Sequence, residues 1–219
     1  MSKYFYKLMS KEFFKRDIAV SLLLALIFSV FLSLAGFDVK CEQLRQNILR
    51  LHIVANSDSD EDQALKLKVR DEILKQSAGI YDGAQSKEEI ALISNNNLKN
   101  FENVAKKVIA QNGKDYSVKV FLGKAYFGTR EYETFTLPAG EYEALRVLIG
   151  EAKGKNWWCV MFPAMCIPAA GEEHSLNEAV DKSAAQIAEN PKKYKLKFKT
   201  VEIFNSIKEK IGKVKDKKA

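Results

Sequence analysis

The side chains best suited to catalysis are three cysteines and two histidines. A thiol beside a histidine base can act as a nucleophile, because the base raises the thiolate fraction. Cys159 with His52 or His174 could form such a pair in an extracytoplasmic thiol hydrolase. The surrounding sequence supplies neither an orienting carboxylate nor an oxyanion hole at a recognisable spacing. We therefore expect that the protein is not an enzyme.

The segment around Cys159 also allows two interpretations without catalysis. Cys159 and Cys166 lie seven positions apart and could form a disulfide outside the cytoplasm, which would leave Cys41 as a spare thiol. Trp157 and Trp158 stand directly before them, and tryptophan is enriched at the energetic centres of interfaces. The pair could equally serve as a core anchor, so the residues alone leave folding and binding open.

An acidic run provides the best candidate for a metal site. Asp58, Asp60 and Asp62 resemble the first half of a calcium loop, but Gln63 and Val69 occupy the places where that loop needs Gly and Glu. The same residue types are good helix N-caps and favour the positive end of the helix dipole. No zinc, phosphate-loop or serine-hydrolase motif occurs. The sequence predicts no metal, no cofactor and no small-molecule substrate.

The elements that must position these residues follow a membrane-length segment. Residues 18–37 are twenty residues without a charge, and such a helix spans about 30 Å, the thickness of the hydrocarbon core. Residues 1–17 hold five basic groups against two acidic ones, which predicts a cytoplasmic N-terminus and an exported remainder. The segment could be an uncleaved anchor or a signal peptide cut after Ala35.

Charge is distributed unevenly over the predicted parts of the chain. The net charge of +7 divides into +3 for residues 1–17, +8 for residues 191–219 and −4 for the region between them. Export argues against nucleic acid as a partner. The lysines near the C-terminus could instead attract anionic lipid headgroups, at about 1 kcal/mol per Lys, or form an ordinary solvated surface. We predict a basic cytoplasmic arm, a transmembrane or signal segment, an extracytoplasmic α+β signalling domain and a Lys-rich tail, at residues 1–17, 18–37, 38–204 and 205–219.

Local periodicity predicts the elements of the exported domain. Apolar or alternating residues predict strands, and apolar faces preceded by capping residues predict helices. The predicted strands are residues 49–55, 116–122, 132–137, 142–149 and 193–201. The predicted helices begin after the capping residues 56–60 and 86, and further helices are expected at residues 176–188 and 203–211. This order indicates an α+β fold with a single mixed or largely antiparallel sheet packed with helices.

Three blocks of this sequence resemble stage II sporulation protein R of endospore-forming bacteria. They are LRLHIVANSDSD at residues 49–60, PAGEYEA at residues 138–144, and the stretch from Gly154 to Cys166. The resemblance extends from about Arg45 to Phe204. Blocks of this length in the same order are more specific than any short motif considered above.

The resemblance implies an intercompartmental signal made in the forespore and exported into the space between the two septal membranes. Its implied partner is a membrane-embedded aspartic protease of the mother cell, which cleaves the precursor of sigma factor E. The domain would bind the extracytoplasmic side of that protease, with the membrane surface as a possible second partner. The partner-binding candidates are three short segments: Asn56, Ser57 and Asp58; Glu141, Tyr142 and Glu143; and Asn156, Trp157 and Trp158. A thiol hydrolase and a structural septal membrane protein are the alternatives.

Overall fold

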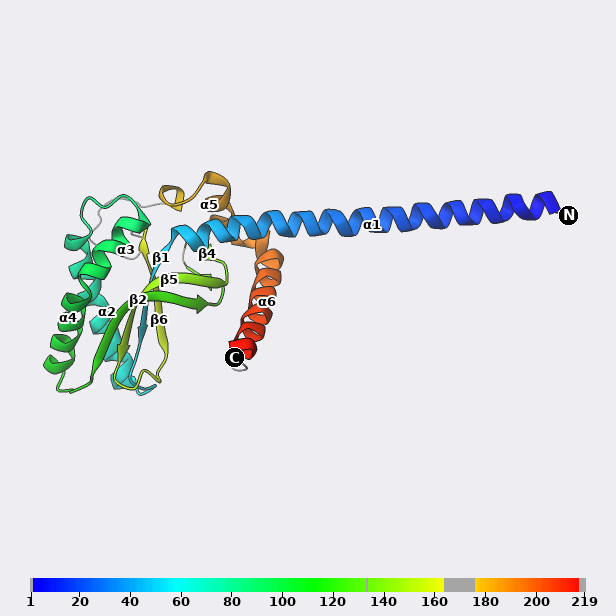
Figure 1. Ribbon diagram of the computed structural model, residues 1–219. Helices are drawn as coiled ribbons and strands as arrows, with labels where there is room; N and C mark the ends of the chain where they lie inside the picture. Colours follow the sequence, from blue (N-terminus) through cyan, green and yellow to red (C-terminus); the bar gives the residue numbers. More distant parts are fainter. Residues whose placement is uncertain (1, 133, 164–175, 217–219) are drawn as a thin grey trace. The chain divides into compact units, whose positions relative to one another are not determined.

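The structure is a computed structural model that describes residues 2–132, 134–163 and 176–216. The chain divides into two compact units, residues 1–40 and residues 41–219. The first unit consists of most of helix α1, and the second contains all the strands and the remaining helices (Figure 1).

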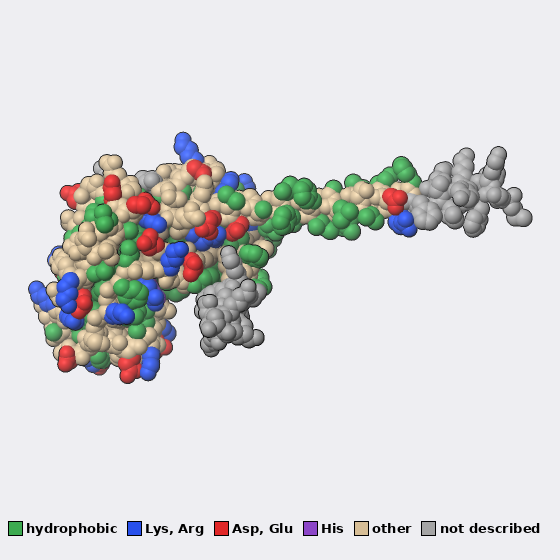
Figure 2. All heavy atoms as spheres, in the orientation of Figure 1, with side chains coloured by type: hydrophobic (Ala, Val, Ile, Leu, Met, Phe, Trp, Pro, Cys, Tyr) green, Lys and Arg blue, Asp and Glu red, His purple; other side chains and the backbone are tan. Residues whose placement is uncertain are grey.

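Helix α1 (Ser2–Asn47) contains the membrane-length segment. One described helix is long and apolar enough to cross a membrane, and it corresponds to residues 14–47 of α1, with a mean hydropathy of 2.7 in its most apolar window. Hydrophobic side chains cover this part of the helix (Figure 2). An anchor and a signal sequence share these properties, so the helix is compatible with either role.

A mixed four-stranded sheet forms the centre of the second unit. Its order is β2 (Val118–Phe127), β5 (Gly140–Ile149), β1 (Leu49–Val54) and β6 (Asn156–Phe162). β1 is parallel to β5, whereas the other two pairings are antiparallel. A separate two-stranded sheet joins β3 (Arg130–Glu131) and β4 (Thr136–Leu137). The predicted α+β class with a mixed sheet is therefore confirmed.

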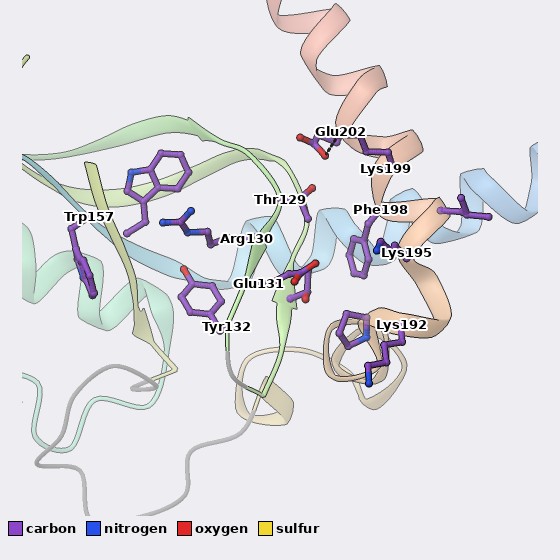
Figure 3. Close-up of a pocket in the computed structure, with 14 residues that line it drawn as sticks. Thr129, Arg130, Glu131, Tyr132, Trp157, Lys192, Lys195, Phe198, Lys199 and Glu202 are labelled. Atoms are coloured by element: carbon purple, nitrogen blue, oxygen red, sulfur yellow. Dashed lines mark hydrogen bonds and ion pairs between the residues drawn. The ribbon is translucent and has the colours of Figure 1, made fainter. Parts of the chain in front are cut away.

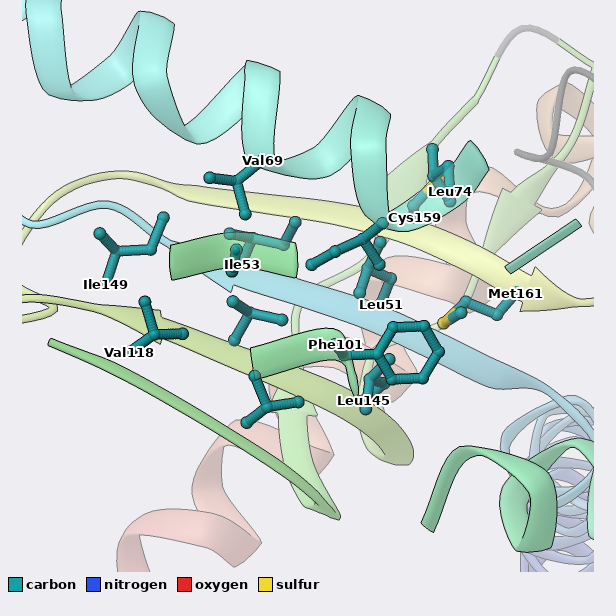
Figure 4. Packing of buried hydrophobic residues seen from close by; sticks show 14 of the residues in the cluster. Leu51, Ile53, Val69, Leu74, Phe101, Val118, Leu145, Ile149, Cys159 and Met161 are labelled. Carbon is teal, nitrogen blue, oxygen red and sulfur yellow. The ribbon is translucent and has the colours of Figure 1, made fainter. Parts of the chain in front are cut away.

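Three helices pack on one side of the sheet: α2 (Asp60–Ile80), α3 (Lys87–Asn96) and α4 (Leu98–Gln111) (Figure 1). Ser59 and Ser86 cap α2 and α3 by accepting hydrogen bonds from backbone N–H groups three residues later. Between helices and sheet lies an apolar core that includes Leu51, Ile53 and Phe101 (Figure 4). We call this side of the sheet the helix-covered face.

The other side of the sheet has a second core and a lighter cover. Its helical elements are η2 (Leu176–Glu178), α5 (Lys182–Glu189) and α6 (Pro191–Asp216). Asp181 caps α5, and the alanines of α5 join the second core together with Phe127 and Tyr142. Asn205 of α6 donates a hydrogen bond to the Ala139 carbonyl at 3.2 Å, which ties α6 to the start of β5.

One predicted strand is wrong. Residues 193–201, where lysines alternate with apolar residues, belong to helix α6. Pro191 suits the first turn of a helix because it lacks an N–H that such a position leaves unpaired. Phe198 and Val201 are buried and lie three residues apart, on one side of the helix. The alternation of lysines with apolar residues therefore resembled a strand pattern. The positions that are actually buried recur with the period of a helix.

Two further predictions need correction, and one element was missed. Residues 132–137 form no single strand: β4 pairs with β3 instead. The long helix expected after Ser86 is broken at Asn97, which ends α3 and begins α4. No strand was predicted at residues 156–162, where β6 lies, because its tryptophans and Cys159 were interpreted for their chemistry instead of their alternation.

Candidate functional site

Strand alternation gives the sheet two chemically different faces. Successive side chains of a strand point to opposite sides, so Leu49, Leu51 and Ile53 of β1 enter the helix-covered core. Arg50 and His52 therefore point to the opposite side. We call that side the cation–aromatic face and define it by these two residues together with Phe127, Arg130, Tyr142, Arg146 and Trp158.

The proposed thiol pair is not assembled. Cys159 is opposite Leu51 in the β1–β6 register and lies in the helix-covered core, whereas His52 is on the other face. Cys159 is also disulfide-bonded and carries no thiol, while Cys41 forms no disulfide and is buried. The predicted disulfide partner Cys166 and the alternative base His174 lie outside the described residues. His52 therefore cannot serve Cys159 as a base.

His52 is instead part of a polar network on the cation–aromatic face. Its Nε2 lies 2.7 Å from Asn156 Oδ1, and Arg146 Nε donates to its Nδ1 at 3.3 Å. These contacts fit a neutral ring that carries its proton on Nε2. Burial holds the pKa of His52 below its ordinary value of 6.5; the Asn156 hydrogen bond opposes this shift, and the charges of Arg146 and Arg50 add to it.

The Asn56–Asp58 segment holds two turns together. Asn56 Nδ2 and Ser57 Oγ donate to Asp62 Oδ2 at 2.8 and 2.6 Å, and Asp58 Oδ1 accepts from the Lys155 backbone at 2.7 Å. A side chain on Gly154 would place its Cβ 2.1 Å from the Ser57 carbonyl oxygen, so the approach requires glycine. Within the described part of the chain, no group of three acidic, His or Cys side chains could hold a metal ion. The segment has a clear structural role.

The Glu141–Glu143 segment also takes part in folding. Tyr142 is 1% exposed and donates from its hydroxyl to the Pro138 carbonyl at 2.7 Å. Burial raises the pKa of Tyr142, which keeps this hydroxyl protonated. Glu143 forms an ion pair of 3.0 Å with Lys87 of α3, whereas Glu141 is exposed.

The two adjacent tryptophans point to opposite faces of the sheet. The Arg70 guanidinium of α2 lies 4.3 Å from the centre of the Trp157 ring, on the helix-covered side. Trp158 packs edge-on against Phe127, with ring centres 5.0 Å apart, and the Arg130 guanidinium lies 5.3 Å from its ring. The predicted Trp157–Trp158 pair is therefore not one continuous contact surface.

Arg50 is the residue that sequence reasoning missed. It is completely buried, and its guanidinium lies 4.1 Å from the Phe127 ring centre and 4.9 Å from that of Tyr142. Among the described residues, no carboxylate forms an ion pair or hydrogen bond with it. A signal was present, because an arginine and a histidine alternate with leucine and isoleucine in the strand LRLHIV. Such alternation in a fully buried strand indicates that polar groups lie in the second core.

With this geometry established, comparison with known proteins identifies the family. The family model described as stage II sporulation protein R matches residues 45–172, which is more than half of the chain. The chain belongs to the stage II sporulation protein R family. A family protein from Bacillus subtilis (strain 168), stage II sporulation protein R, is 36% identical over 138 residues, which are 63% of this chain and 62% of that protein. No solved structure matches.

The family match covers the four-stranded sheet and every residue that defines the cation–aromatic face. Helix α1 is matched only in its last residues, and α6 lies beyond the match. The matched region of this sporulation protein is thus the domain core with both faces of its sheet. The two lysine-rich ends of the chain are outside it.

Proposed function

We propose that this protein is an exported sporulation signal that activates the membrane-embedded aspartic protease processing the sigma factor E precursor in the mother cell. Membership of the stage II sporulation protein R family carries the proposal. The apolar segment of helix α1 supports export, since the basic residues at the start of the helix, before that segment, favour a cytoplasmic N-terminus and an α+β domain outside the cytoplasm.

Activation requires that the domain bind the active state of the protease more tightly than the inactive state. A change from 1:99 to 99:1 needs a preference of about 5.5 kcal/mol. Most of the nine candidate binding residues already have partners inside the domain, as Asn56, Ser57 and Tyr142 do. The accessible part of the cation–aromatic face fits a binding role better, because Arg130 is exposed and Trp158 is half-buried, and arginine and tryptophan are enriched among the residues that dominate the energetics of interfaces.

The exposed side chains of helix α6 are suited to holding the domain close to a membrane surface. Leu196, Ile203 and Ile207 are 85%, 53% and 52% exposed, and their spacing of seven and four residues places them on one side of the helix. That side is opposite to Phe198 and Val201, which are buried against the domain. A lysine-rich helix with an apolar stripe is suited to an anionic membrane surface. Such contact would raise the effective concentration of the domain near a membrane protease.

Co-expression tests the proposal. The full-length chain, the protease and the sigma factor E precursor are produced together in a bacterium that does not sporulate, and precursor cleavage is followed by immunoblotting. We expect cleavage only when all three are present and the protease retains its catalytic aspartate. No cleavage in the presence of exported, folded chain would contradict the proposal.

A matched pair of charge reversals tests the face. Arg130→Glu changes an exposed cation of the cation–aromatic face and should lower cleavage about tenfold, as charge repulsion at an interface does. Lys107→Glu reverses an exposed cation on α4, behind the helix-covered face, and should leave cleavage unchanged. Equal effects of the two variants would argue against this face as the contact.

A further inference from the structure

A cavity of about 1040 Å³ opens beside the cation–aromatic face. Its walls come from β3 and the β3–β4 connection, from β6 and from the first turns of α6 (Figure 3). Tyr132 and Trp158 line one side, and Phe198 lines the other. The cavity thus has aromatic walls, and charged and hydroxyl-bearing side chains also line it.

Arg50 lies behind one wall of this cavity with most of its donors unused. Its Nη2 donates to the Tyr132 hydroxyl at 2.6 Å, but its Nε and Nη1 are buried without a hydrogen-bond partner. A guanidinium has five N–H donors and cannot lose its charge in a protein. A buried charge without a counterion raises the free energy of the fold. A nearby acceptor or negative charge would lower that cost.

The lining supplies further donors in the same state. The Nε1 groups of Trp157 and Trp158 and the hydroxyl oxygens of Thr129 and Thr136 are buried without hydrogen-bond partners. The Tyr132 oxygen accepts from Arg50, so its own proton is available for donation into the cavity. Each unmet buried donor is costly, and an incoming acceptor removes several such costs together.

Cationic side chains outnumber carboxylates around the cavity, which favours an anionic ligand. Arg130, Lys192, Lys195 and Lys199 line it together with Glu131 and Glu202, and Glu202 is already paired with Lys199 at 3.2 Å. The balance is cationic, which attracts an anion. The aromatic walls favour an anion that also carries an apolar group, as an acidic peptide does and inorganic phosphate does not.

We infer that this cavity binds a carboxylate from an acidic peptide segment of a partner protein, with an apolar side chain of the same segment against Trp158 and Phe198. Tyr132 would donate to the carboxylate, and its donation would be strengthened by the Arg50 guanidinium behind it. The inference rests on the proposed function in one respect: the segment would belong to the extracytoplasmic side of the protease.

The two tryptophans make the test specific. The full-length chain in detergent micelles, with ¹⁵N in its two indole groups, gives one N–H signal for each, assigned with Trp157→Phe and Trp158→Phe. The probe is the peptide N-acetyl-Phe-Glu-amide, and N-acetyl-Phe-Gln-amide is its uncharged control. We expect the acidic peptide to shift the Trp158 signal with half-saturation at about 1 mM or below, a modest affinity for a ligand of this size. Trp157 also borders the cavity, but its ring packs against Arg70 on the helix-covered side, so its signal should shift less than that of Trp158.

Two variants connect the shift to the donors. Tyr132→Phe removes the hydroxyl that contacts Arg50 and should weaken peptide binding about tenfold, as loss of a charge-assisted hydrogen bond does. Tyr116→Phe removes a hydroxyl next to the helix-covered core and should leave binding unchanged. Circular dichroism confirms that both variants are folded.

The outcomes separate clearly. A saturable shift that is larger for Trp158 than for Trp157 and is weakened by Tyr132→Phe supports the site. No shift, equal shifts of both signals, or equal binding of the Gln peptide would overturn it, and tighter binding of inorganic phosphate than of the acidic peptide would overturn the carboxylate assignment. A Trp158 shift without precursor cleavage in co-expression would uphold the site and reject the protease role, and cleavage without the shift would do the reverse.

Discussion

The two faces of the sheet differ in the chemistry of their buried side chains. On the helix-covered face, Leu51, Ile53 and their neighbours meet three helices through apolar contacts. On the cation–aromatic face, the same strands direct Arg50, His52 and Trp158 into a core of rings and guanidinium groups. The first arrangement stabilises the fold through apolar burial. The second keeps a charge in a buried place at an energetic cost, which is typical of functional sites.

Neighbouring residues of β1 show the difference most directly. Arg50 and Leu51 are both completely buried, yet one has aromatic neighbours and unpaired donors and the other has only apolar neighbours. Cation–π contacts offset part of the desolvation of Arg50, by about 2 kcal/mol for a desolvated pair. The remaining cost lowers the stability of the fold, whereas burial of Leu51 raises it.

Leu51→Ala should produce the largest change. Removing a completely buried leucine from the helix-covered core should lower the free energy of unfolding by about 3 kcal/mol, since transfer and cavity terms add. Urea titration followed by tryptophan fluorescence measures it, and Leu51→Ile, which conserves volume, should cost less than about 1.5 kcal/mol. A loss below about 1 kcal/mol for Leu51→Ala would remove the distinction between the faces.

Arg50→Met should act in the opposite direction. Methionine fills similar space without a buried charge, so we expect the free energy of unfolding to rise by about 1 kcal/mol. Precursor cleavage in the co-expression assay should nevertheless fall about tenfold, because the donor behind Tyr132 is lost. A variant that is both less stable and fully active would show that Arg50 supports folding alone.

The smallest predicted effect is a dependence on pH. Because the pKa of His52 is lowered in the fold, the unfolded chain binds a proton more readily below about pH 6.5, and stability should fall as the pH drops through and below that value. Urea titrations at about pH 7.5 and 5.5 measure the change. His52→Gln should reduce the loss between these two pH values. An unchanged loss in this variant would place the titrating group elsewhere, away from the cation–aromatic face.

Local patterns predicted a large part of the fold. Apolar or alternating residues predicted β1, β2 and β5, and capping residues predicted the start of α2 and α3. The same method failed at residues 193–201, where lysines on a helix imitated alternation. Lysine is compatible with both structures, since its long side chain reaches solvent from either. Only the burial of Phe198 and Val201 distinguishes them.

Local sequence patterns predicted much less of the candidate site. Trp157 and Trp158 stood out by composition, but their separation onto two faces follows from the register of β6 with β1. Arg50 drew no attention because its neighbours in the strand are apolar. Its significance depends on Phe127 and Tyr142, which come from β2 and β5, far away in the sequence.

The sequence by itself determined the membrane-length helix, the helix caps, the α+β class and the family resemblance, because each depends on residues close together in the chain. The tertiary structure decided that Cys159 and His52 lie on opposite faces, that α6 is a helix, and that Arg50 is surrounded by aromatic rings. Alternation states only that a strand has two faces. Which segments cover each face depends on long-range packing, and that packing gives the same strands one apolar face and one face of aromatic rings and guanidinium groups.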